Sequence, residues 1–431
     1  MAPGEGPALE CPMATGPVRG DFRPPGSKSL TQRWLLLAAL ASGRSTIRHA
    51  LRSDDVDALA GGLRALGADI SWTDQATLVV EGCGGRFPSS GLLHAAEGGT
   101  PARVLMAAAA MADRPATVDG SDRLRARPMR DGAALLEVMG ARVRRVGAGE
   151  LPLEVCGGPC FGRGGEFQID RPASSQFVSA VALLGPWLER GLSLRVRGGV
   201  PSASYVALTV QCLRGLGVAA IWDGHAIHVP PGPPQAFDVT VEPDASSAAY
   251  GFAVAALVPG SRVHVPALSL ASGQPDVAVA RALSDMGSTL ESDASGCTIS
   301  HGAPWRGGVL DASDWPDGSL AVMAVAAGMD GVTEVRGLST LAAKESDRVA
   351  SMQAWLEAAG AVVERGPDWI RIRGPFGHGR PVLVDTMRDH RVAMSAAVAG
   401  ALRGGVRVAD PRCVDKSWPG FWRAWADLLG S

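Results

Sequence analysis

A helix-like segment that ends in a hydrophobic residue and a glycine, and is followed by a β-like segment, recurs six times along this 431-residue chain. The glycines that mark the copies are spaced 70 to 77 residues apart and are Gly67, Gly140, Gly217, Gly287, Gly360 and Gly430. Each copy reads as helix, strand, helix, strand, with glycine in the left-handed position that ends a helix. One such unit cannot bury both faces of its helices alone, so the repeat requires units that pack on each other.

Two groups of three units would bury these helices, and we expect an α/β fold of that kind. The Ala-rich first helix of each unit is apolar nearly all round, which is typical of burial inside a domain. A solenoid of six repeats is the alternative, but a period of 70 residues exceeds the roughly 20 to 50 residues usual for solenoids. With 46% hydrophobic residues, the chain is long enough for two or three ordinary domains.

Composition excludes several classes of function. A net charge of -2 gives no electrostatic reason to expect nucleic acid or an anionic membrane as a partner. Seven cysteines without a CxxC pair argue against a disulfide framework or a zinc ribbon and fit a reducing cytosol. No signal segment is visible in the first fifteen residues, and apolar runs such as 104–111 are shorter than the roughly 20 residues that cross a bilayer. We therefore expect a cytoplasmic protein.

Lysine is scarce in this chain. Of 41 Lys and Arg residues, only Lys28, Lys344 and Lys416 are lysines. Where a generic positive charge serves, arginine has been used, so the three lysines mark places that need a compact, strongly hydrated ammonium. Chance survival of three scattered lysines is the alternative.

Polar residues gather where the first helix of each unit is expected to begin. These starts are Ser27-Lys28-Ser29, Gly99-Thr100, Ser174-Ser175-Gln176, Asp244-Ala245-Ser246, Asp317-Gly318-Ser319 and Asp389-His390-Arg391. Free N–H groups and the helix dipole make helix N-termini anion sites. Ordinary N-caps are the alternative, and we favour it for Asp244, Ser246 and Ser247, which no cation accompanies.

Cations at other helix starts favour an anion site. They oppose the helix dipole unless an anion arrives, and they are Lys28, Arg127, Lys344, Arg348 and Arg391. The segment PGSKS lacks the upstream glycine of a Walker A motif, and no GxSxG elbow is present, so the serines read as anion ligands rather than nucleophiles. Neither the histidines nor the acidic residues show metal-ligand spacing, so we expect no metal.

Over nearly its full length the chain resembles a known family. The blocks PPGSKSLTQRWLLLAALASG, LRSDDVDALAGGLRALGA, GGTPARVL, DRLRARPM, ASSQFVSAVAL, PDGSLAVMAVAAG, KESDR, DHRVAMSAAVAG and DPRCVDKSWPGF follow one another in family order. On these blocks the chain is identified as a member of the 5-enolpyruvylshikimate-3-phosphate synthase (3-phosphoshikimate 1-carboxyvinyltransferase) family.

The resemblance implies the two-domain enolpyruvyl transferase fold, an inside-out α/β barrel of six βαβαββ units, three in each domain. By similarity one domain comprises residues 1–22 plus 242–431 and the other residues 23–241, with the active site in the interdomain cleft. It implies transfer of the enolpyruvyl group of phosphoenolpyruvate to the 5-hydroxyl of shikimate 3-phosphate, with release of phosphate, in aromatic amino acid biosynthesis. It also implies a monomer without cofactor, and a target of glyphosate.

The resemblance further implies the site residues. The phosphoenolpyruvate ligands by similarity are Lys28, Gly99, Arg127, Gln176, Arg348, Arg391 and Lys416. Those of shikimate 3-phosphate are Lys28, Ser29, Arg33, Ser174, Ser175, Gln176, Ser202, Tyr205, Asp317, Thr340 and Lys344.

The family chemistry needs proton carriers. Asp317 is expected to be the base at the acceptor hydroxyl and Glu345 the proton carrier at the methylene carbon, with Lys28 and Lys344 assisting. By themselves, Asp317 would read as an N-cap and Glu345 as a solvated first-turn carboxylate.

Departures from the family pattern concern the acceptor and glyphosate sensitivity rather than the fold. They are Glu97, Pro101, Val104, Thr340 and Ala342. The related transferase acting on UDP-N-acetylglucosamine has an Asn after its first-block Lys and a loop Cys, whereas this chain has Ser29 and no Cys in RLRARPMRD. A paralogue of specialised metabolism acting on another phosphorylated cyclic alcohol remains the alternative. A non-catalytic anion-binding descendant would be expected to have lost Asp317 or Glu345.

Overall fold

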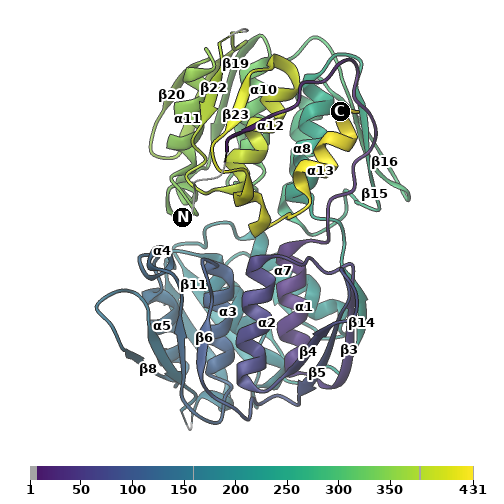
Figure 1. Cartoon of the computed structure of the whole chain (residues 1–431). Helices are drawn as coiled ribbons and strands as arrows, with labels where there is room; N and C mark the ends of the chain where they lie inside the picture. Colours follow the sequence, from purple (N-terminus) through teal and green to yellow (C-terminus); the bar gives the residue numbers. More distant parts are fainter. Residues whose placement is uncertain (1–6, 159, 378–379, 431) are drawn as a thin grey trace. The chain divides into compact units, whose positions relative to one another are not determined.

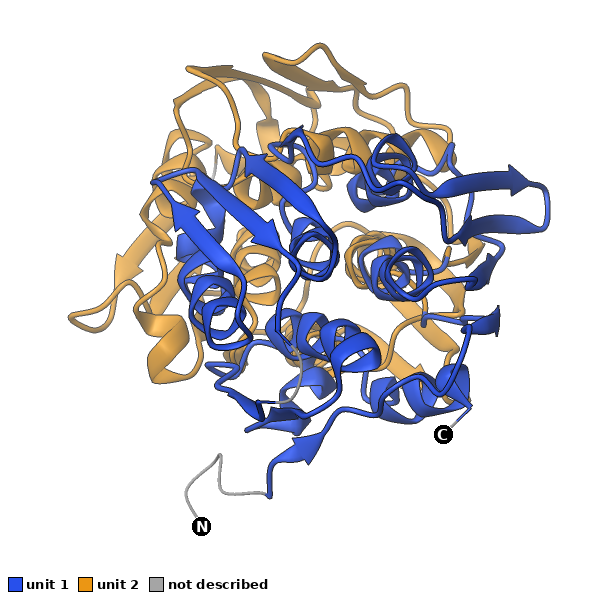
Figure 2. Ribbon diagram, turned by 90° about the horizontal axis from the view of Figure 1, so that it is seen from above, with its two compact units in different colours: residues 1–25, 243–431 blue, residues 26–242 orange. Residues whose placement is uncertain are grey.

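The chain forms two compact units (Figure 2). The structure is a computed structural model, and it describes residues 7–158, 160–377 and 380–430. Unit 1 combines Met1–Pro25 with Pro243–Ser431, and unit 2 is Gly26–Glu242. The chain therefore leaves unit 1 after Pro25 and returns to it at Pro243.

Within the described residues, unit 2 is built from three four-stranded sheets and the helices that pack on them. The strands, in sheet order, are β14 (Asp238–Thr240), β3 (Ser42–Arg48), β5 (Leu78–Cys83) and β4 (Asp69–Trp72); β6 (Leu92–His94), β7 (Ala116–Asp119), β9 (Leu153–Cys156) and β8 (Arg142–Arg145); β10 (Gly165–Asp170), β11 (Leu192–Arg197), β13 (Ala226–Val229) and β12 (Ile221–Trp222). The helices are α1 (Lys28–Leu40), α2 (Asp54–Leu66), α3 (Gly99–Ala109), α4 (Asp122–Arg125), α5 (Arg130–Val138), α6 (Ser175–Ala182) and α7 (Ser204–Gly215), with short 3₁₀ turns η1 (Phe161–Arg163) and η2 (Gly185–Trp187).

Unit 1 repeats this plan with two four-stranded sheets and one three-stranded sheet among its described residues. The strands, in sheet order, are β16 (Thr289–Asp293), β17 (Gly296–Ser300), β15 (Arg262–Pro266) and β2 (Arg19–Asp21); β18 (Val309–Asp311), β19 (Gly331–Arg336), β21 (Trp369–Gly374) and β20 (Val362–Arg365); β1 (Leu9–Glu10), β23 (Val406–Val408) and β22 (Val382–Val384). The helices, most of them labelled in Figure 1, are α8 (Ala245–Leu257), α9 (Ala278–Asp285), α10 (Ser319–Gly328), α11 (Arg348–Ala358), α12 (His390–Arg403) and α13 (Phe421–Leu429), with η3 (Pro275–Val277), η4 (Ser339–Ala343) and η5 (Pro411–Lys416).

The sixfold repeat is confirmed, and each full copy carries two more strands than the helix, strand, helix, strand pattern predicts. In the second copy, β6 precedes α3 and pairs parallel with β7, and the last segment is the antiparallel hairpin β8–β9. The additional strands are only three to six residues long, too short to give a hydrophobic period of their own. All six marker glycines have positive φ, from 71° at Gly430 to 121° at Gly287, which a side chain would strain.

The first helices of the copies are buried on all sides, as their composition predicts. Every residue of α1 from Leu30 to Leu40 is buried, and so is every residue of α10 from Ser319 to Ala327. In unit 1, α8, α10 and α12 pack against one another and form the centre of the core. This packing fixes the start of each of these helices, where the predicted site residues lie.

At both crossings, the strand that precedes the crossing pairs with a strand of the unit that the chain is leaving. Before the first crossing, β2 stays in unit 1 and pairs parallel with β15, with Gly20 opposite Val263. Before the second crossing, β14 stays in unit 2 and pairs parallel with β3, with Val239 opposite Ile47. Each unit therefore completes one of its sheets with a strand that is distant in sequence.

Candidate functional site

Seven predicted or neighbouring charged residues of unit 1 form a continuous network, the unit 1 charge cluster. Its members are Asp317, Lys344, Glu345, Arg348, Asp389, Arg391 and Lys416. They come from the turn before α10, the segment between η4 and α11, the first residue of α11, the start of α12 and the end of η5. Segments far apart in sequence thus bring their helix starts to one place, as the repeat predicts.

Arg348 is the centre of this cluster. Its side chain is 1% exposed, and its guanidinium donates to three carboxylates. It lies 2.7 Å from Asp317 Oδ1, 2.7 Å from Glu345 Oε2 and 2.8 Å from Asp389 Oδ2. The two carboxylates predicted to carry protons are therefore held by the same side chain.

The other cations of the cluster bind the same two carboxylates. Lys344 Nζ is 3.4 Å from Asp317 Oδ1, and a terminal nitrogen of Arg391 is 3.3 Å from Asp317 Oδ2. Lys416 Nζ is 3.4 Å from Glu345 Oε1. Four cations thus face three carboxylates within this set of described residues, and an arriving anion would compete with these carboxylates for the cations.

The cluster controls the ionisation of Asp317. Burial opposes the charged form, but Lys344, Arg391 and Arg348 outweigh it and hold the pKa of this carboxyl far below its usual range. Burial in turn lowers the pKa of the Lys344 ammonium, against the attraction of Asp317. The pKa of Arg348 is raised despite its burial, because Asp389, Glu345 and Asp317 surround it. Without substrate, Asp317 is an ionised carboxylate that is tightly held.

A second group of predicted residues lies at the starts of α1 and α3 in unit 2. Lys28 Nζ, at the first residue of α1, is 3.1 Å from Asp55 Oδ2. A β-carbon added at Gly99 would stand only 2.6 Å from a guanidinium nitrogen of Arg127, so the arginine lies directly against the helix start. At Gly98 an added β-carbon would stand 2.8 Å from Asp55 Oδ1, so both cations lie beside the same short loop.

The start of α6 joins this group through Arg103. Arg103 donates to the Gln176 side-chain oxygen and to the Pro128 carbonyl, and its guanidinium lies 4.9 Å from the centre of the Phe177 ring. Ser174 caps α6, since its hydroxyl accepts the Gln176 N–H at 3.2 Å. The predicted ligand Gln176 is thus positioned by an arginine that the sequence analysis did not assign.

Arg33 is placed differently from a simple phosphate ligand. It is 6% exposed and donates to the Thr209 hydroxyl at 2.8 Å, the Ser29 carbonyl at 2.8 Å and the Tyr205 carbonyl at 3.0 Å. Its guanidinium therefore ties α1 to α7 and fixes the backbone of two other predicted ligands. Ser202, which precedes α7, holds a positive φ of 53°, a strained conformation for a serine.

Of the two aspartates that the sequence offers as ordinary N-caps, Asp244 and Asp317, only Asp244 is one. Asp244 caps α8 by accepting the Ser247 N–H at 2.8 Å, as predicted. Asp317 is not a cap: in the described part of the chain, the start of α10 receives no side-chain cap, and both Asp317 oxygens face cations. Glu345 is not a solvated carboxylate either, because its side chain is 13% exposed and bound to Arg348 and Lys416.

Two arginines of the segment around Arg127 have carboxylate partners. Arg125 lies 2.7 Å from Asp119, and Arg130 lies 2.6 Å from Glu150. Both therefore have carboxylate partners, and the Arg127 guanidinium lies against the start of α3 at Gly99. The Thr340 hydroxyl oxygen is buried, with no hydrogen-bond partner among the described residues.

Two of the carboxylates that hold the cations, Asp55 and Asp389, were not among the predicted site residues. Asp55 pairs with Lys28, and Asp389, which is fully buried, accepts from Arg348, from the Ser346 hydroxyl and from the Arg391 N–H. Asp389 belongs to a predicted helix start, but nothing in its spacing shows that it would face Arg348. Only the packing of α11 against α12 brings the two together.

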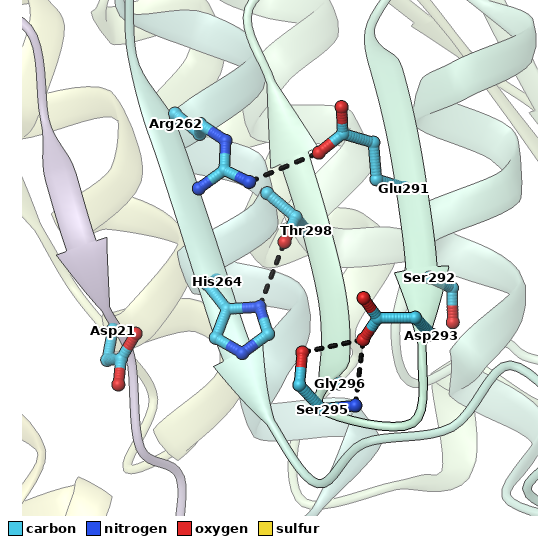
Figure 3. Close-up of a pocket in the computed structure, with 9 residues that line it drawn as sticks. All are labelled: Asp21, Arg262, His264, Glu291, Ser292, Asp293, Ser295, Gly296 and Thr298. Atoms are coloured by element: carbon cyan, nitrogen blue, oxygen red, sulfur yellow. Dashed lines mark hydrogen bonds and ion pairs between the residues drawn. The ribbon is translucent and has the colours of Figure 1, made fainter.

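A separate hollow of about 270 Å³ lies on the sheet β16–β17–β15–β2 of unit 1 (Figure 3). It is lined by Asp21, Arg262, His264, Glu291, Ser292, Asp293, Ser295, Gly296 and Thr298, none of them a predicted site residue. Its groups bond to each other: Arg262 lies 3.1 Å from Glu291, and His264 lies 2.9 Å from the Thr298 hydroxyl. We assign no function to this hollow.

Two negative findings apply to the described residues. Among residues 7–158, 160–377 and 380–430, no group of three or more His, Cys, Asp or Glu side chains is placed to hold a metal ion. In the same ranges, no helix has both the length and the apolar composition to span a membrane.

The fold is that of the enolpyruvyl transferases. The structure is similar to the enolpyruvyl transferase NikO from Streptomyces tendae, with a TM-score of 0.74 and 19% identity over 99% of this chain and 98% of that one. It is also similar to EPSP synthase from Acinetobacter baumannii, with a TM-score of 0.81 and 24% identity over 97% of both chains.

Sequence comparison shows the family. The profile of EPSP synthase (3-phosphoshikimate 1-carboxyvinyltransferase) matches residues 12–425. The chain is 37% identical to the 3-phosphoshikimate 1-carboxyvinyltransferase of Methanoculleus marisnigri, over 95% of this chain and 97% of the relative. It is 35% identical to that of Bordetella petrii, over 98% and 97%. The chain belongs to the EPSP synthase family.

Proposed function

We propose that this protein transfers the enolpyruvyl group of phosphoenolpyruvate to the 5-hydroxyl of shikimate 3-phosphate and releases phosphate. Family membership supports the reaction class. The observation that carries the proposal is that Asp317 and Glu345 each lie 2.7 Å from the one buried guanidinium of Arg348. Two carboxylates held on one anion-binding cation suit a reaction that moves protons beside a phosphorylated substrate.

The charges of the substrates explain the cations. Each substrate carries a phosphate and a carboxylate, so several arginines, lysines and helix starts are needed to offset them. We assign phosphoenolpyruvate to the residues that the resemblance implies for it: Lys28, Gly99, Arg127, Gln176, Arg348, Arg391 and Lys416. On arrival, its anionic groups replace the carboxylates that hold these cations in the absence of substrate.

We assign the acceptor to a second set, which includes hydroxyl and amide donors. Its members are Lys28, Ser29, Ser174, Ser175, Gln176, Ser202, Tyr205, Asp317, Thr340 and Lys344. Arg33 belongs to this set through the carbonyls of Ser29 and Tyr205, which it fixes. The buried Thr340 hydroxyl has no hydrogen-bond partner among the described residues, which supports its assignment, since a ligand would supply the missing hydrogen bond.

The reaction then follows in two steps. Asp317 takes the proton of the 5-hydroxyl as its oxygen bonds to the central carbon of phosphoenolpyruvate, while Glu345 gives a proton to the methylene carbon. The tetrahedral intermediate loses phosphate, assisted by the ammonium groups of Lys28 and Lys344, and the new methyl group returns one proton to Glu345. The hydroxyl proton leaves with the phosphate, so atoms and charges balance. The chemistry needs no cofactor or metal, and we expect it to occur in the cytoplasm, in a monomer.

Phosphate release from phosphoenolpyruvate, measured with and without shikimate 3-phosphate, tests this proposal. We expect release only with the acceptor, and an enolpyruvyl ether as the product. Absence of stimulation at millimolar acceptor would refute it in favour of a paralogue that uses another phosphorylated cyclic alcohol. Thr340, where the family usually has Asn, is the first position to examine in that event.

A further inference from the structure

A further carboxyl group lies directly behind the turn that carries Asp317. Asp276, in the 3₁₀ turn η3, is 2% exposed. A β-carbon added at Gly318 would stand 3.2 Å from the carboxyl carbon of Asp276 and 2.5 Å from Val279 Cγ2. Only a residue without a side chain fits between them, so Asp276 is packed against the residue that follows Asp317.

The hydrogen bonding of Asp276 is incomplete for a charged group. One carboxyl oxygen accepts from the Ser246 hydroxyl, and the other is buried with no hydrogen-bond partner among the described residues. An ionised buried carboxylate normally has several donors, whereas a protonated one needs fewer. This environment suits a carboxyl that gains and loses its proton.

The charged groups around Asp276 come from three neighbouring elements. Asp244 precedes α8, Asp317 precedes α10, and Arg391 lies in the first turn of α12. The helix α8 adds the Ser246 hydroxyl, and the charged residues of α9, Arg281 and Asp285, are exposed at the surface. Burial first, and then the charges of Asp317 and Asp244, raise the pKa of Asp276 to about 6 against the opposing effect of Arg391.

This placement meets a need of the proposed mechanism, on which the inference rests. Three cations suppress the proton affinity of Asp317, and a base that binds protons too weakly removes a hydroxyl proton slowly. A second negative charge close to Asp317, which also attracts Arg391, would raise that affinity. Asp276 supplies this charge only in its ionised form.

We propose that Asp276 is a positioning residue that acts through Asp317: its negative charge, held behind the Asp317–Gly318 turn, makes Asp317 a stronger base. Asp276 itself does not touch the substrate. The rate of the base-dependent step therefore rises as Asp276 loses its proton.

The experiment compares Asp276→Asn with the wild type at saturating phosphoenolpyruvate and shikimate 3-phosphate from pH 5 to 8.5. Asparagine copies the protonated, neutral carboxyl and can keep the contact with Ser246. We expect the ratio of the variant rate to the wild-type rate to be near one at pH 5 and to fall about three- to tenfold by pH 8, in step with the ionisation of Asp276. Ionisation of the substrate phosphates affects both proteins equally and cancels in this ratio.

Ser246→Ala provides a second test, because it changes the pKa of Asp276 and leaves the Asp276 carboxyl in place. Loss of the hydroxyl raises the pKa of Asp276 further, since that hydrogen bond favours the ionised form. Its rate relative to wild type should therefore dip between about pH 6 and 7 and recover by pH 8. Asp244→Asn keeps the α8 cap but removes a negative charge that raises the pKa of Asp276. The dependence of the rate on the ionisation of Asp276 should therefore remain and move to lower pH.

A rate ratio for Asp276→Asn that does not change with pH, or a Ser246→Ala ratio without the dip, would overturn this inference, because a purely structural role has no reason to follow one ionisation. A wild type that does not turn over shikimate 3-phosphate would instead overturn the proposed function, and the inference with it. The two failures are thereby distinguished.

Discussion

Arg348 is the residue on which the unit 1 charge cluster depends most. It is almost fully buried and bound to Asp317, Glu345 and Asp389. Removing one partner from a buried ionic network costs more than the net stabilisation of the pair, because it leaves charge uncompensated. The cations and carboxylates therefore hold each other in place until substrate anions compete for the cations.

Asp317→Ala should lower turnover by about 10²–10⁴-fold, the range for loss of a general base, while phosphoenolpyruvate still binds. Removal of the carboxylate leaves Lys344, Arg348 and Arg391 with less competition for the substrate anion. Steady-state rates and a direct binding measurement check this result. Asp311→Ala is the matched control, because Asp311 lies in the same segment and bonds only to Ser313 in the described structure. Normal turnover of Asp317→Ala would show that Asp317 is not the base.

Lys28→Arg should reduce kcat/KM by at least about 10²-fold, although the charge is kept. The ammonium at the start of α1 sits 3.1 Å from Asp55, and a planar guanidinium cannot replace this compact group. Arg86→Lys, a change at an exposed pair with Asp113, should have little effect and serves as the control. Near-normal activity of Lys28→Arg would contradict the interpretation of lysine scarcity.

At the residue scale, the sequence predicted the cations better than the carboxylates. Lys28, Arg348 and Arg391 stood out because a cation opposes the dipole at a helix start. Asp55 and Asp276 carried no such signal, because a carboxylate near a helix start is ordinary. Their roles depend on which segments pack together, which a single sequence does not reveal.

At the element scale, helix starts determine where the site residues lie. The helix α12 begins at His390, and Asp389 both accepts the Arg391 N–H and receives the Arg348 side chain. In unit 2, the start of α3 is open because Gly98 and Gly99 have no side chains, which lets Asp55 and Arg127 approach the backbone. A short side chain at either glycine would push the charged groups away.

Gly99→Ala should displace Arg127 and raise KM for phosphoenolpyruvate about tenfold, the loss expected for one weakened charged hydrogen bond. The added β-carbon would lie 2.6 Å from the guanidinium, and its stability effect should be small because the arginine side chain can move. Gly91→Ala is the control, because no atom of the described residues lies within 4 Å of a β-carbon added at Gly91. Equal KM values for the two variants, measured at saturating acceptor, would contradict this assignment of Arg127.

The long helices could be predicted from the sequence, whereas the short strands could not. The long helices and their glycine ends follow from periodicity and from the positive φ that glycine allows. Strands of two or three residues, such as β1, β2 and β14, have no detectable pattern. The repeat pattern therefore located the helices but undercounted the strands.

At the scale of the whole molecule, the crossings divide the chain into a continuous and a discontinuous unit. Residues 26–242 contain unit 2 complete with β14, which covers the edge of β3. We expect this fragment to fold alone and to unfold cooperatively on heating. A fragment of residues 26–237, which lacks β14, should melt at a lower temperature, because the edge of β3 is exposed. A fragment 26–242 without a cooperative transition would show that the units are not independent.

In the proposed mechanism, Asp317 and Glu345 move protons while an enolpyruvyl group is transferred. The most direct measurement is the deuterium content of the product methylene group when the reaction with shikimate 3-phosphate runs in deuterium oxide, read by NMR. Addition of a solvent-derived proton creates a rotating methyl group, so we expect deuterium in the methylene of the product. We also expect Glu345→Gln to slow incorporation and turnover together. Product formed at the full rate without deuterium would contradict this mechanism.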